Sequence, residues 1–235
     1  MSIKKHIPNT ITCCNLVSGC IATTFAFCGN LQMALFWIIM GAVFDFFDGM
    51  SARLLKVSSP IGKELDSLAD DITFGLAPST IVFWLLGVVE YPAFLEPYRN
   101  IIPFFAFVMA AFSALRLAKF NLDERQTTSF IGLPTPANAL FWGALIVSNP
   151  SWLIHGSYAL FIILAMVCIS SYLLISELPM FALKFKQWGW KGNEIKYYFI
   201  ALSIILFFVL GIWEAWAVII ACYVLISIFM FLRKH

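Results

Sequence analysis

The sequence has few charged residues. Aspartate, glutamate, lysine and arginine make up 12% of its 235 residues, while 61% are hydrophobic and the mean hydropathy is +0.89. Soluble domains carry about 25% charged residues, so this composition indicates an integral membrane protein. The net charge of only +2 gives no sign of a surface that binds nucleic acid, and we expect no nucleic-acid partner.

Paired cysteines and a leader cleavage site are also lacking. None of the six cysteines has the C-x-x-C spacing of a zinc site, and all fall in apolar stretches, so we interpret them as small apolar residues. Lys4 and Lys5 precede an apolar run, but no small-residue cleavage site follows at a suitable distance. No cleavable signal peptide is therefore expected.

Long apolar runs dominate what is present. A membrane-spanning helix needs about 20 mostly apolar residues, and turn residues such as Gly29-Asn30 and Asn149-Pro150 separate the runs. The sequence therefore predicts an all-α polytopic membrane protein of about eight transmembrane helices. The predicted segments are 11–29, 32–54, 65–88, 101–120, 136–149, 157–177, 197–212 and 215–232.

Basic residues predict the orientation. If both termini are cytosolic, the inner side holds every lysine and arginine except Arg99, a strong positive-inside bias. We therefore expect an integral protein of the cell (inner) membrane with both termini in the cytosol. The inner-side cations would be Lys4, Lys5, Arg53, Lys56, Lys63, Arg116, Lys119, Arg125, Lys184, Lys186, Lys191, Lys196, Arg233 and Lys234.

Four carboxylates interrupt the second and third apolar segments near their cytosolic ends. Asp45 and Asp48 lie three residues apart and Asp66 and Asp70 four apart, so each pair shares one helix face. The two helices are consecutive, and we expect their cytosolic halves to pack side by side. One carboxylate at mid-depth costs about 2.5–3.5 kcal/mol, so four together need cations. Carboxylate oxygens suit Mg²⁺, Mn²⁺ or Ca²⁺, and four can hold two metals about 3.5–4 Å apart.

Small and basic residues accompany the carboxylates. Gly49 and Ala52 leave space for a phosphate, Arg53 supplies a planar cation, and Gly62 allows close helix approach. Together they indicate a diphosphate held by metal ions. Asp71 points about 100° away from Asp70, so we expect it to lie outside the ligand set or to face solvent.

The segment from Asp45 to Asp70 reads D-x2-D-G-x2-A-R-x8-G-x3-D-x3-D, which resembles the signature of the CDP-alcohol phosphotransferase family at every fixed position. The resemblance implies a six-helix core, a site on the cytosolic side and a homodimer. It also implies that Asp45, Asp48, Asp66 and Asp70 hold two divalent cations and that Asp70 is the general base. The CDP-lipid contacts are then expected at Asn9, Thr10, Gly49, Ala52, Arg53 and Ser59.

Two further segments, ALRLAKFN (114–121) and FIGLPTPA (130–137), are similar to those of the membrane-type phosphatidylserine synthases of bacteria and archaea. This resemblance covers roughly residues 5–180 and implies a catalytic domain at 1–180. Residues 181–235 would add a cytosolic basic loop and two helices. It implies CDP-diacylglycerol and L-serine as substrates in the lipid bilayer. Arg116 and Lys119 would bind the serine carboxylate and Asn121 would hydrogen-bond to its ammonium or carboxylate group, although the two cations also fit simple interface anchors.

Two other functions stay open. A related enzyme could use glycerol 3-phosphate or inositol phosphate, but those acceptors favour a denser cluster of cations than Arg116 and Lys119 supply. A divalent-cation transporter would need a polar route through the outer half of the membrane, where the second and third segments are nearly free of charge.

Overall fold

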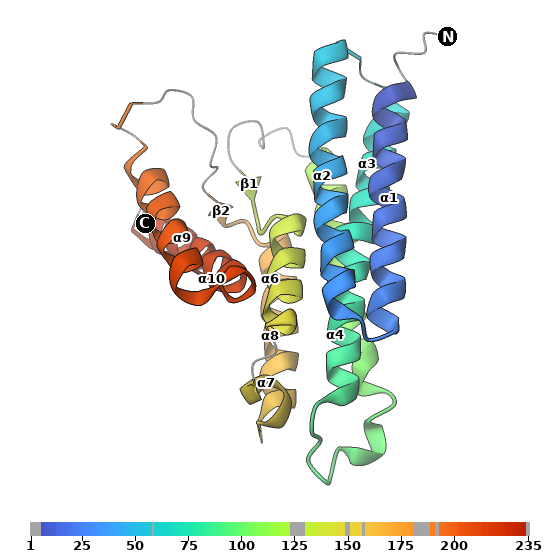
Figure 1. Ribbon diagram of the computed structural model, residues 1–235, viewed down its shortest axis with the longest axis vertical. Helices are drawn as coiled ribbons and strands as arrows, with labels where there is room; N and C mark the ends of the chain where they lie inside the picture. Colours follow the sequence, from blue (N-terminus) through green and yellow to red (C-terminus); the bar gives the residue numbers. More distant parts are fainter. Residues whose placement is uncertain are drawn as a thin grey trace.

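The computed structural model describes residues 6–57, 59–122, 130–148, 151–156, 158–180, 189–190 and 193–233. Helices dominate these ranges, and the strands comprise two residues each, which confirms the all-α prediction (Figure 1). Most of the predicted basic loop lies outside the described residues. The cations Lys4, Lys5, Arg125, Lys184, Lys186, Lys191 and Lys234 also lie outside them.

The first two helices form an antiparallel hairpin. Helix α1 spans His6–Phe27 and α2 spans Leu31–Leu55. Gly29 adopts φ +75° between them, a left-handed conformation that glycine adopts without strain. Asn30 then caps α2, because its side chain accepts a hydrogen bond from the Met33 backbone N–H at 3.2 Å.

The third predicted segment is one membrane helix in three parts: α3 (Pro60–Asp70), a π-helical segment η2 (Asp71–Leu76) and α4 (Ala77–Val88). It begins five residues before the predicted residue 65 because Ser59 caps it, accepting from the Gly62 N–H at 3.0 Å, and Pro60 occupies its first turn. The π-helical turn directly follows Asp70. Such turns are rare and are frequent at functional sites.

The remaining helices overlap the other predicted segments, except for the short elements at 96–98 and 151–155, which lie between them. Five helical stretches in the described part of the chain are long and apolar enough to cross a membrane, while α6 and α8 are apolar but shorter. The five are 6–27, 31–55, 60–88, 102–122 and 212–232. The other elements are η3 (Glu96–Tyr98), η4 (Ile102–Ala106), α5 (Phe107–Leu122), β1 (Phe130–Ile131), α6 (Thr135–Val147), α7 (Ser151–His155), α8 (Ala159–Ile175), β2 (Pro179–Met180), α9 (Glu194–Leu210) and α10 (Ile212–Leu232).

The core lies where α1, α2, α4, α6 and α8 meet, around fully buried side chains such as Ile38, Phe74 and Trp142. Helices α6 and α8 stand between the α1–α4 group and the α9–α10 pair, and α10 packs against α6 (Figure 1). Strand β1 pairs antiparallel with β2, which ties the segment before α6 to the segment after α8.

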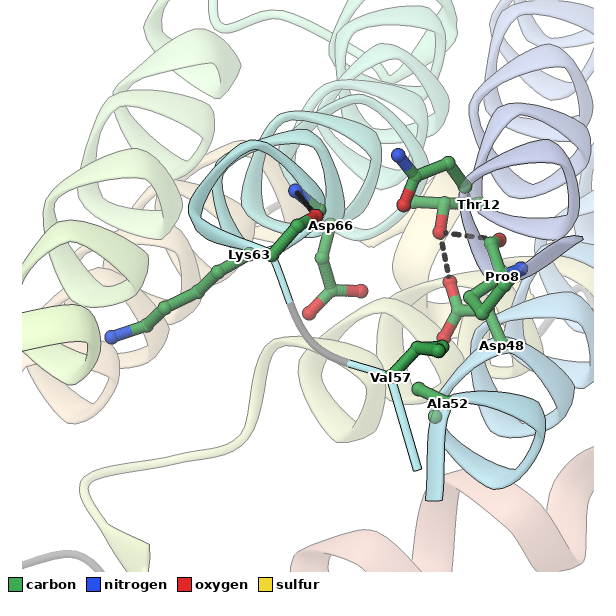
Figure 2. Close-up of a pocket in the computed structure, with 11 residues that line it drawn as sticks. Pro8, Thr12, Asp48, Ala52, Val57, Lys63 and Asp66 are labelled. Atoms are coloured by element: carbon green, nitrogen blue, oxygen red, sulfur yellow. Dashed lines mark hydrogen bonds between the residues drawn. The ribbon is translucent and has the colours of Figure 1, made fainter. Parts of the chain in front are cut away.

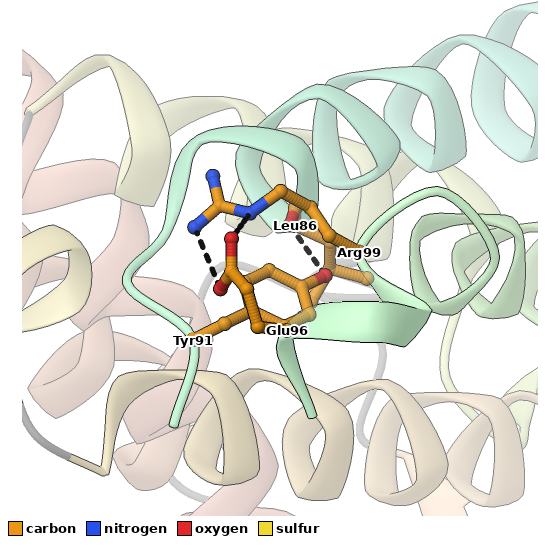
Figure 3. Close-up of polar contacts among 4 residues, drawn as sticks. All are labelled: Leu86, Tyr91, Glu96 and Arg99. Carbon is orange, nitrogen blue, oxygen red and sulfur yellow. Dashed lines mark hydrogen bonds and ion pairs between the residues drawn. The ribbon is translucent and has the colours of Figure 1, made fainter. Parts of the chain in front are cut away.

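The loop between α4 and α5 contains Arg99, the cation that the orientation argument leaves outside. Its Nε lies 2.9 Å from Glu96 Oε1, and its guanidinium stacks over the Tyr91 ring at 4.8 Å (Figure 3). The Tyr91 hydroxyl donates to the Leu86 carbonyl at 2.8 Å, and burial raises the pKa of Tyr91. The Arg99 charge is therefore neutralised locally by Glu96.

Thr73 of η2 is where three helices approach most closely. A Cβ on Gly19 of α1 would lie 2.8 Å from the Thr73 Cα and 2.9 Å from its backbone nitrogen, and Gly41 of α2 faces the Thr73 side chain. The Thr73 hydroxyl donates to the Asn15 carbonyl at 3.0 Å. Glycine at positions 19 and 41 thus allows α1 and α2 to reach the π-helical segment.

Gly19→Ala should destabilise the protein by roughly 1–3 kcal/mol, because the new methyl group meets backbone atoms that cannot move independently of η2. Gly87→Ala is the matched control, since Gly87 is an exposed helical glycine with open space around it. We expect Gly87→Ala to have an unchanged or slightly higher melting temperature. Thermal unfolding in detergent measures both, and equal melting temperatures for the two variants would contradict the close approach at Thr73.

Candidate functional site

Three of the four predicted aspartates converge on one small volume. Carboxylate oxygens of Asp45 and Asp48 on α2 and of Asp66 on α3 all lie within 4.8 Å of one another. Asp48 is 6% exposed, and Asp45 and Asp66 are half-buried. The spacing of three residues on α2 brings its two aspartates onto one face, as the sequence predicts.

The helices that carry these aspartates do not pack directly side by side, contrary to the sequence-based expectation. Helix α1 packs against both α2 and α3, and the carboxylates of α2 and α3 face each other across the space between them. The small residues Gly49 and Ala52 of α2 and Gly62 of α3 line this space, so no bulky side chain closes it.

The three carboxylates lack protein cations. Within the described residues, no lysine or arginine forms an ion pair with any of them, and Asp66 Oδ1 is buried without a hydrogen-bond partner. Buried, unpaired carboxylates are strongly unfavourable. A hard divalent cation satisfies such a set of oxygens, so the residues present fit the predicted metal site.

Asp70, the fourth aspartate, stands beside this group and makes its own contact. Its Oδ1 accepts a hydrogen bond from the Asn15 side-chain amide of α1 at 3.0 Å. Asp70 also lies within electrostatic range of Asp45, Asp48 and Asp66 and of Arg116. A carboxylate near both the acidic group and a cation suits a group that moves a proton, but its predicted roles as base and ligand stay predictions.

A pocket of about 260 Å³ opens beside the acidic group. Figure 2 shows Asp48 and Asp66 facing this space while the Lys63 side chain extends away from it. Four of the six predicted CDP-lipid contacts line the pocket: Asn9, Gly49, Ala52 and Ser59.

The other two predicted CDP-lipid contacts, Arg53 and Thr10, are not part of the pocket lining. Arg53 is exposed, and its guanidinium lies over Gly49, with Nη1 3.4 Å from the place of a Cβ on that glycine. Thr10 is also exposed and donates to the His6 carbonyl at 2.9 Å, so it is not part of the pocket lining. Arg53 can therefore reach a phosphate at the rim, whereas Thr10 makes a local helix contact.

The predicted serine-binding residues do not form one cluster. Arg116 is 8% exposed, its Nη1 lies 3.5 Å from Thr135 Oγ1, and its guanidinium stacks over the Phe120 ring at 5.3 Å. Lys119 is exposed, and the Asn121 amide donates to Ser67 Oγ at 2.8 Å. Arg116 lies within electrostatic range of Asp70.

Asn121 fastens α5 to α3 in this structure. Besides its bond to Ser67, its carbonyl accepts a hydrogen bond from Lys63 Nζ at 2.8 Å. Both contacts tie the C-terminal end of α5 to the helix that carries Asp66 and Asp70. The geometry therefore gives Asn121 a positioning contact rather than a place in the acidic pocket.

Two residues of α1 join the site that the sequence-based reasoning missed, Thr12 and Asn15. The Thr12 hydroxyl lies 2.6 Å from Asp48 Oδ2 and 3.1 Å from the Pro8 carbonyl, and Asn15 is the partner of Asp70. Both are buried, and they lie three residues apart on one face of an otherwise apolar helix. That polar spacing is the signal that could have identified them.

The sequence matches a known protein family. The model of the CDP-alcohol phosphatidyltransferase family matches residues 5–173, which include all the candidate site residues and end before α9. The chain belongs to this family.

Three relatives of this chain share the name CDP-diacylglycerol–serine O-phosphatidyltransferase. The protein from Bacillus subtilis (strain 168) is 34% identical over 174 residues, which cover 74% of this chain and 89% of that protein. The protein from Helicobacter pylori (strain ATCC 700392 / 26695) is 33% identical over 135 residues, covering 57% and 54%. The protein from Saccharomyces cerevisiae (strain ATCC 204508 / S288c) is 36% identical over 152 residues, covering 58% and 51%. The matched segment thus spans most of the first relative and about half of the other two.

Thr12→Val should weaken divalent-cation binding about 10–100-fold, because it leaves Asp48 Oδ2 without its donor and frees the carboxylate to rotate. Thr24→Val is the matched control, since the Thr24 hydroxyl of the same helix donates only to the Cys20 carbonyl and is exposed. Mn²⁺ titration followed by electron paramagnetic resonance measures both affinities. Wild-type affinity in Thr12→Val would show that Asp48 is not oriented by Thr12.

Proposed function

We propose that the protein transfers the phosphatidyl group of CDP-diacylglycerol to L-serine, producing phosphatidylserine and CMP. The observation that carries this proposal is the convergence of Asp45, Asp48 and Asp66 beside a pocket lined by small residues. The family membership and the names of the relatives support the same reaction.

The cofactors in this proposal are two divalent cations, Mg²⁺ or Mn²⁺, held by Asp45, Asp48 and Asp66 together with Asp70. When bound, the metals polarise the phosphoryl group under attack and stabilise the CMP that leaves. The unpaired Asp66 Oδ1 and the absence of protein cations at the three carboxylates, within the described residues, support this assignment.

Residues of the pocket bind the donor. The open surface at Gly49 and Ala52 admits the diphosphate, Arg53 contacts a phosphate from the rim, and Asn9 and Ser59 hydrogen-bond to the cytidine half. The acyl chains enter sideways from the bilayer between the helices. This arrangement leaves the phosphorus next to diacylglycerol facing the acidic group.

Arg116 binds the acceptor and Asp70 deprotonates it. The serine hydroxyl oxygen attacks the phosphorus that bears diacylglycerol, the bond from this phosphorus to the bridging oxygen of CMP breaks, and the hydroxyl proton passes to Asp70. Asn15 holds Asp70 in place through its hydrogen bond, and Arg116 binds the serine carboxylate.

The cellular setting in this proposal is the inner membrane, with both termini and the site on the cytosolic side and the protein assembled as a homodimer. The positive-inside distribution supports the orientation. Residues 1–180 form the catalytic domain, and residues 181–235 add the basic loop and two helices.

Purified protein should release CMP from CDP-diacylglycerol only when a divalent cation and L-serine are present. A panel of L-serine, glycerol 3-phosphate and inositol phosphate identifies the acceptor. CMP release with a phosphorylated acceptor but not with L-serine would replace the serine assignment. Arg116 as the cation beside the site favours the single negative charge of a carboxylate.

Asp70→Asn should lower kcat at least about 100-fold, because the serine proton then has no acceptor, while CDP-diacylglycerol still binds. Glu64→Gln is the control, since Glu64 is an exposed carboxylate on the same helix α3 and is outside the pocket lining. The rate of conversion of radiolabelled CDP-diacylglycerol, followed in quenched samples at saturating substrate, gives kcat. Full activity in Asp70→Asn would refute its assignment as the base.

Arg116→Ala should raise the KM for L-serine at least about tenfold and leave the KM for CDP-diacylglycerol nearly unchanged, because one charge-assisted hydrogen bond to the acceptor is lost. Initial rates at varied concentrations of each substrate measure the two constants. An equal rise in both constants would return Arg116 to a structural role.

A further inference from the structure

Asp71 is a half-buried acidic residue that the proposed reaction does not use. It is the first residue of the π-helical segment η2, directly after Asp70, and its Oδ1 is buried without a hydrogen-bond partner. It is not one of the three aspartates whose oxygens converge. A carboxylate inside a membrane helix without a partner is unfavourable and most often marks a functional contact.

Ser113 of α5 lies next to Asp71 and also lacks a partner. A Cβ on Gly75 would lie 2.6 Å from Asp71 Oδ1 and 3.0 Å from the Ser113 Cβ, so both side chains border the same glycine. Ser113 is fully buried, and its hydroxyl makes no hydrogen bond, although a helical serine can readily bond to its own backbone. Asp71 Oδ1 and Ser113 Oγ are therefore two buried oxygens on side chains that border Gly75, and neither receives a hydrogen bond.

Arg116 extends this set by one helical turn. It lies three residues after Ser113, on the same face of α5, and its Nε is buried without a partner. Thr135 and the Phe120 ring hold its guanidinium, and Asp70 lies within electrostatic range. Unsatisfied acceptor oxygens thus lie at and near Ser113, and the unsatisfied Arg116 Nε–H donor belongs to a residue one helical turn further along α5.

We propose that Asp71 and Ser113 bind the ammonium group of the amino-acid acceptor while Arg116 binds its carboxylate, which makes Asp71 a specificity-determining residue. This inference rests on the proposed function. An ammonium group has three N–H donors, enough for Asp71 Oδ1 and Ser113 Oγ together, and its charge offsets that of the buried carboxylate. The acceptor hydroxyl then lies toward Asp70, the neighbour of Asp71 in the chain.

The arrangement selects a zwitterion. An acceptor phosphate placed at Asp71 would meet a like charge, and an alcohol without an ammonium group would leave Asp71 Oδ1 and Ser113 Oγ unsatisfied. Discrimination by unpaired buried groups is strong, because the wrong ligand leaves them without partners.

The test compares L-serine with 3-hydroxypropanoate, which has the same hydroxyl and carboxylate but no ammonium group. In Asp71→Asn, the KM for L-serine should rise at least about tenfold. The binding of 3-hydroxypropanoate, measured as a substrate or as a competitive inhibitor, should stay nearly unchanged. Ser113→Ala should also raise the KM for L-serine relative to the binding constant for 3-hydroxypropanoate, by a smaller factor than Asp71→Asn does. Glu64→Gln, which changes an exposed carboxylate, should leave this ratio of constants at the wild-type value.

Each outcome separates this inference from the proposed function. If wild-type protein releases no CMP with L-serine, the proposed function fails. If wild-type protein uses L-serine but Asp71→Asn and Ser113→Ala weaken both acceptors equally, or neither, then Asp71 has a structural role, for example toward a buried water, and the inference is overturned. The melting temperature and the KM for CDP-diacylglycerol of both variants identify any general loss of folding.

Discussion

The arrangement of α1, α2 and α3 depends on one electrostatic constraint: Asp45, Asp48 and Asp66 lie close together inside membrane helices without a protein cation among the described residues. Their mutual repulsion would separate α2 from α3 unless other groups hold the helices. Helix α1 does so, because it packs against both and donates hydrogen bonds to the acidic set from Thr12 and Asn15. The close approach at Gly19 fixes α1 against the π-helical segment. Metal binding and helix packing are therefore coupled in this fold.

The acidic group was predictable from the sequence because it depends on local periodicity. Spacings of three and four residues bring carboxylates onto one helix face whatever the rest of the chain does, and an apolar background makes them conspicuous. The same local rule located the helices, whose limits moved only where a cap, such as Ser59 before Pro60, added a turn. Gly49 and Ala52 were likewise identified from their places beside Asp48, and both line the pocket.

Other features depend on contacts between helices, which spacing alone does not fix. The packing of α1 against both α2 and α3, and hence the contacts of Thr12 and Asn15, depends on glycine contacts with Thr73 far along the chain. Asp71 lies outside the converging carboxylates, as its rotation of about 100° from Asp70 predicts, but the π-helical segment that begins at Asp71 was not predictable from spacing. On α5, the resemblance of the segment 114–121 grouped Arg116 with Asn121, yet they differ by about 140° around the helix and contact different partners.

The two halves of the site come from different parts of the chain, and this division has a chemical consequence. Helices α2 and α3 carry the residues that suit metals and a diphosphate, whereas the residues suited to an acceptor lie on α5 and at the first turn of η2. Helix α5 is braced against α3 by Lys63, Ser67 and Asn121 at its end, and Arg116 contacts Thr135 of α6. These contacts hold α5, and with it Arg116, against α3 and α6 through side chains other than the four aspartates. If the acceptor binds at Arg116 and Asp71 as we propose, substitutions on α5 and η2 can change the acceptor while the acidic signature stays the same.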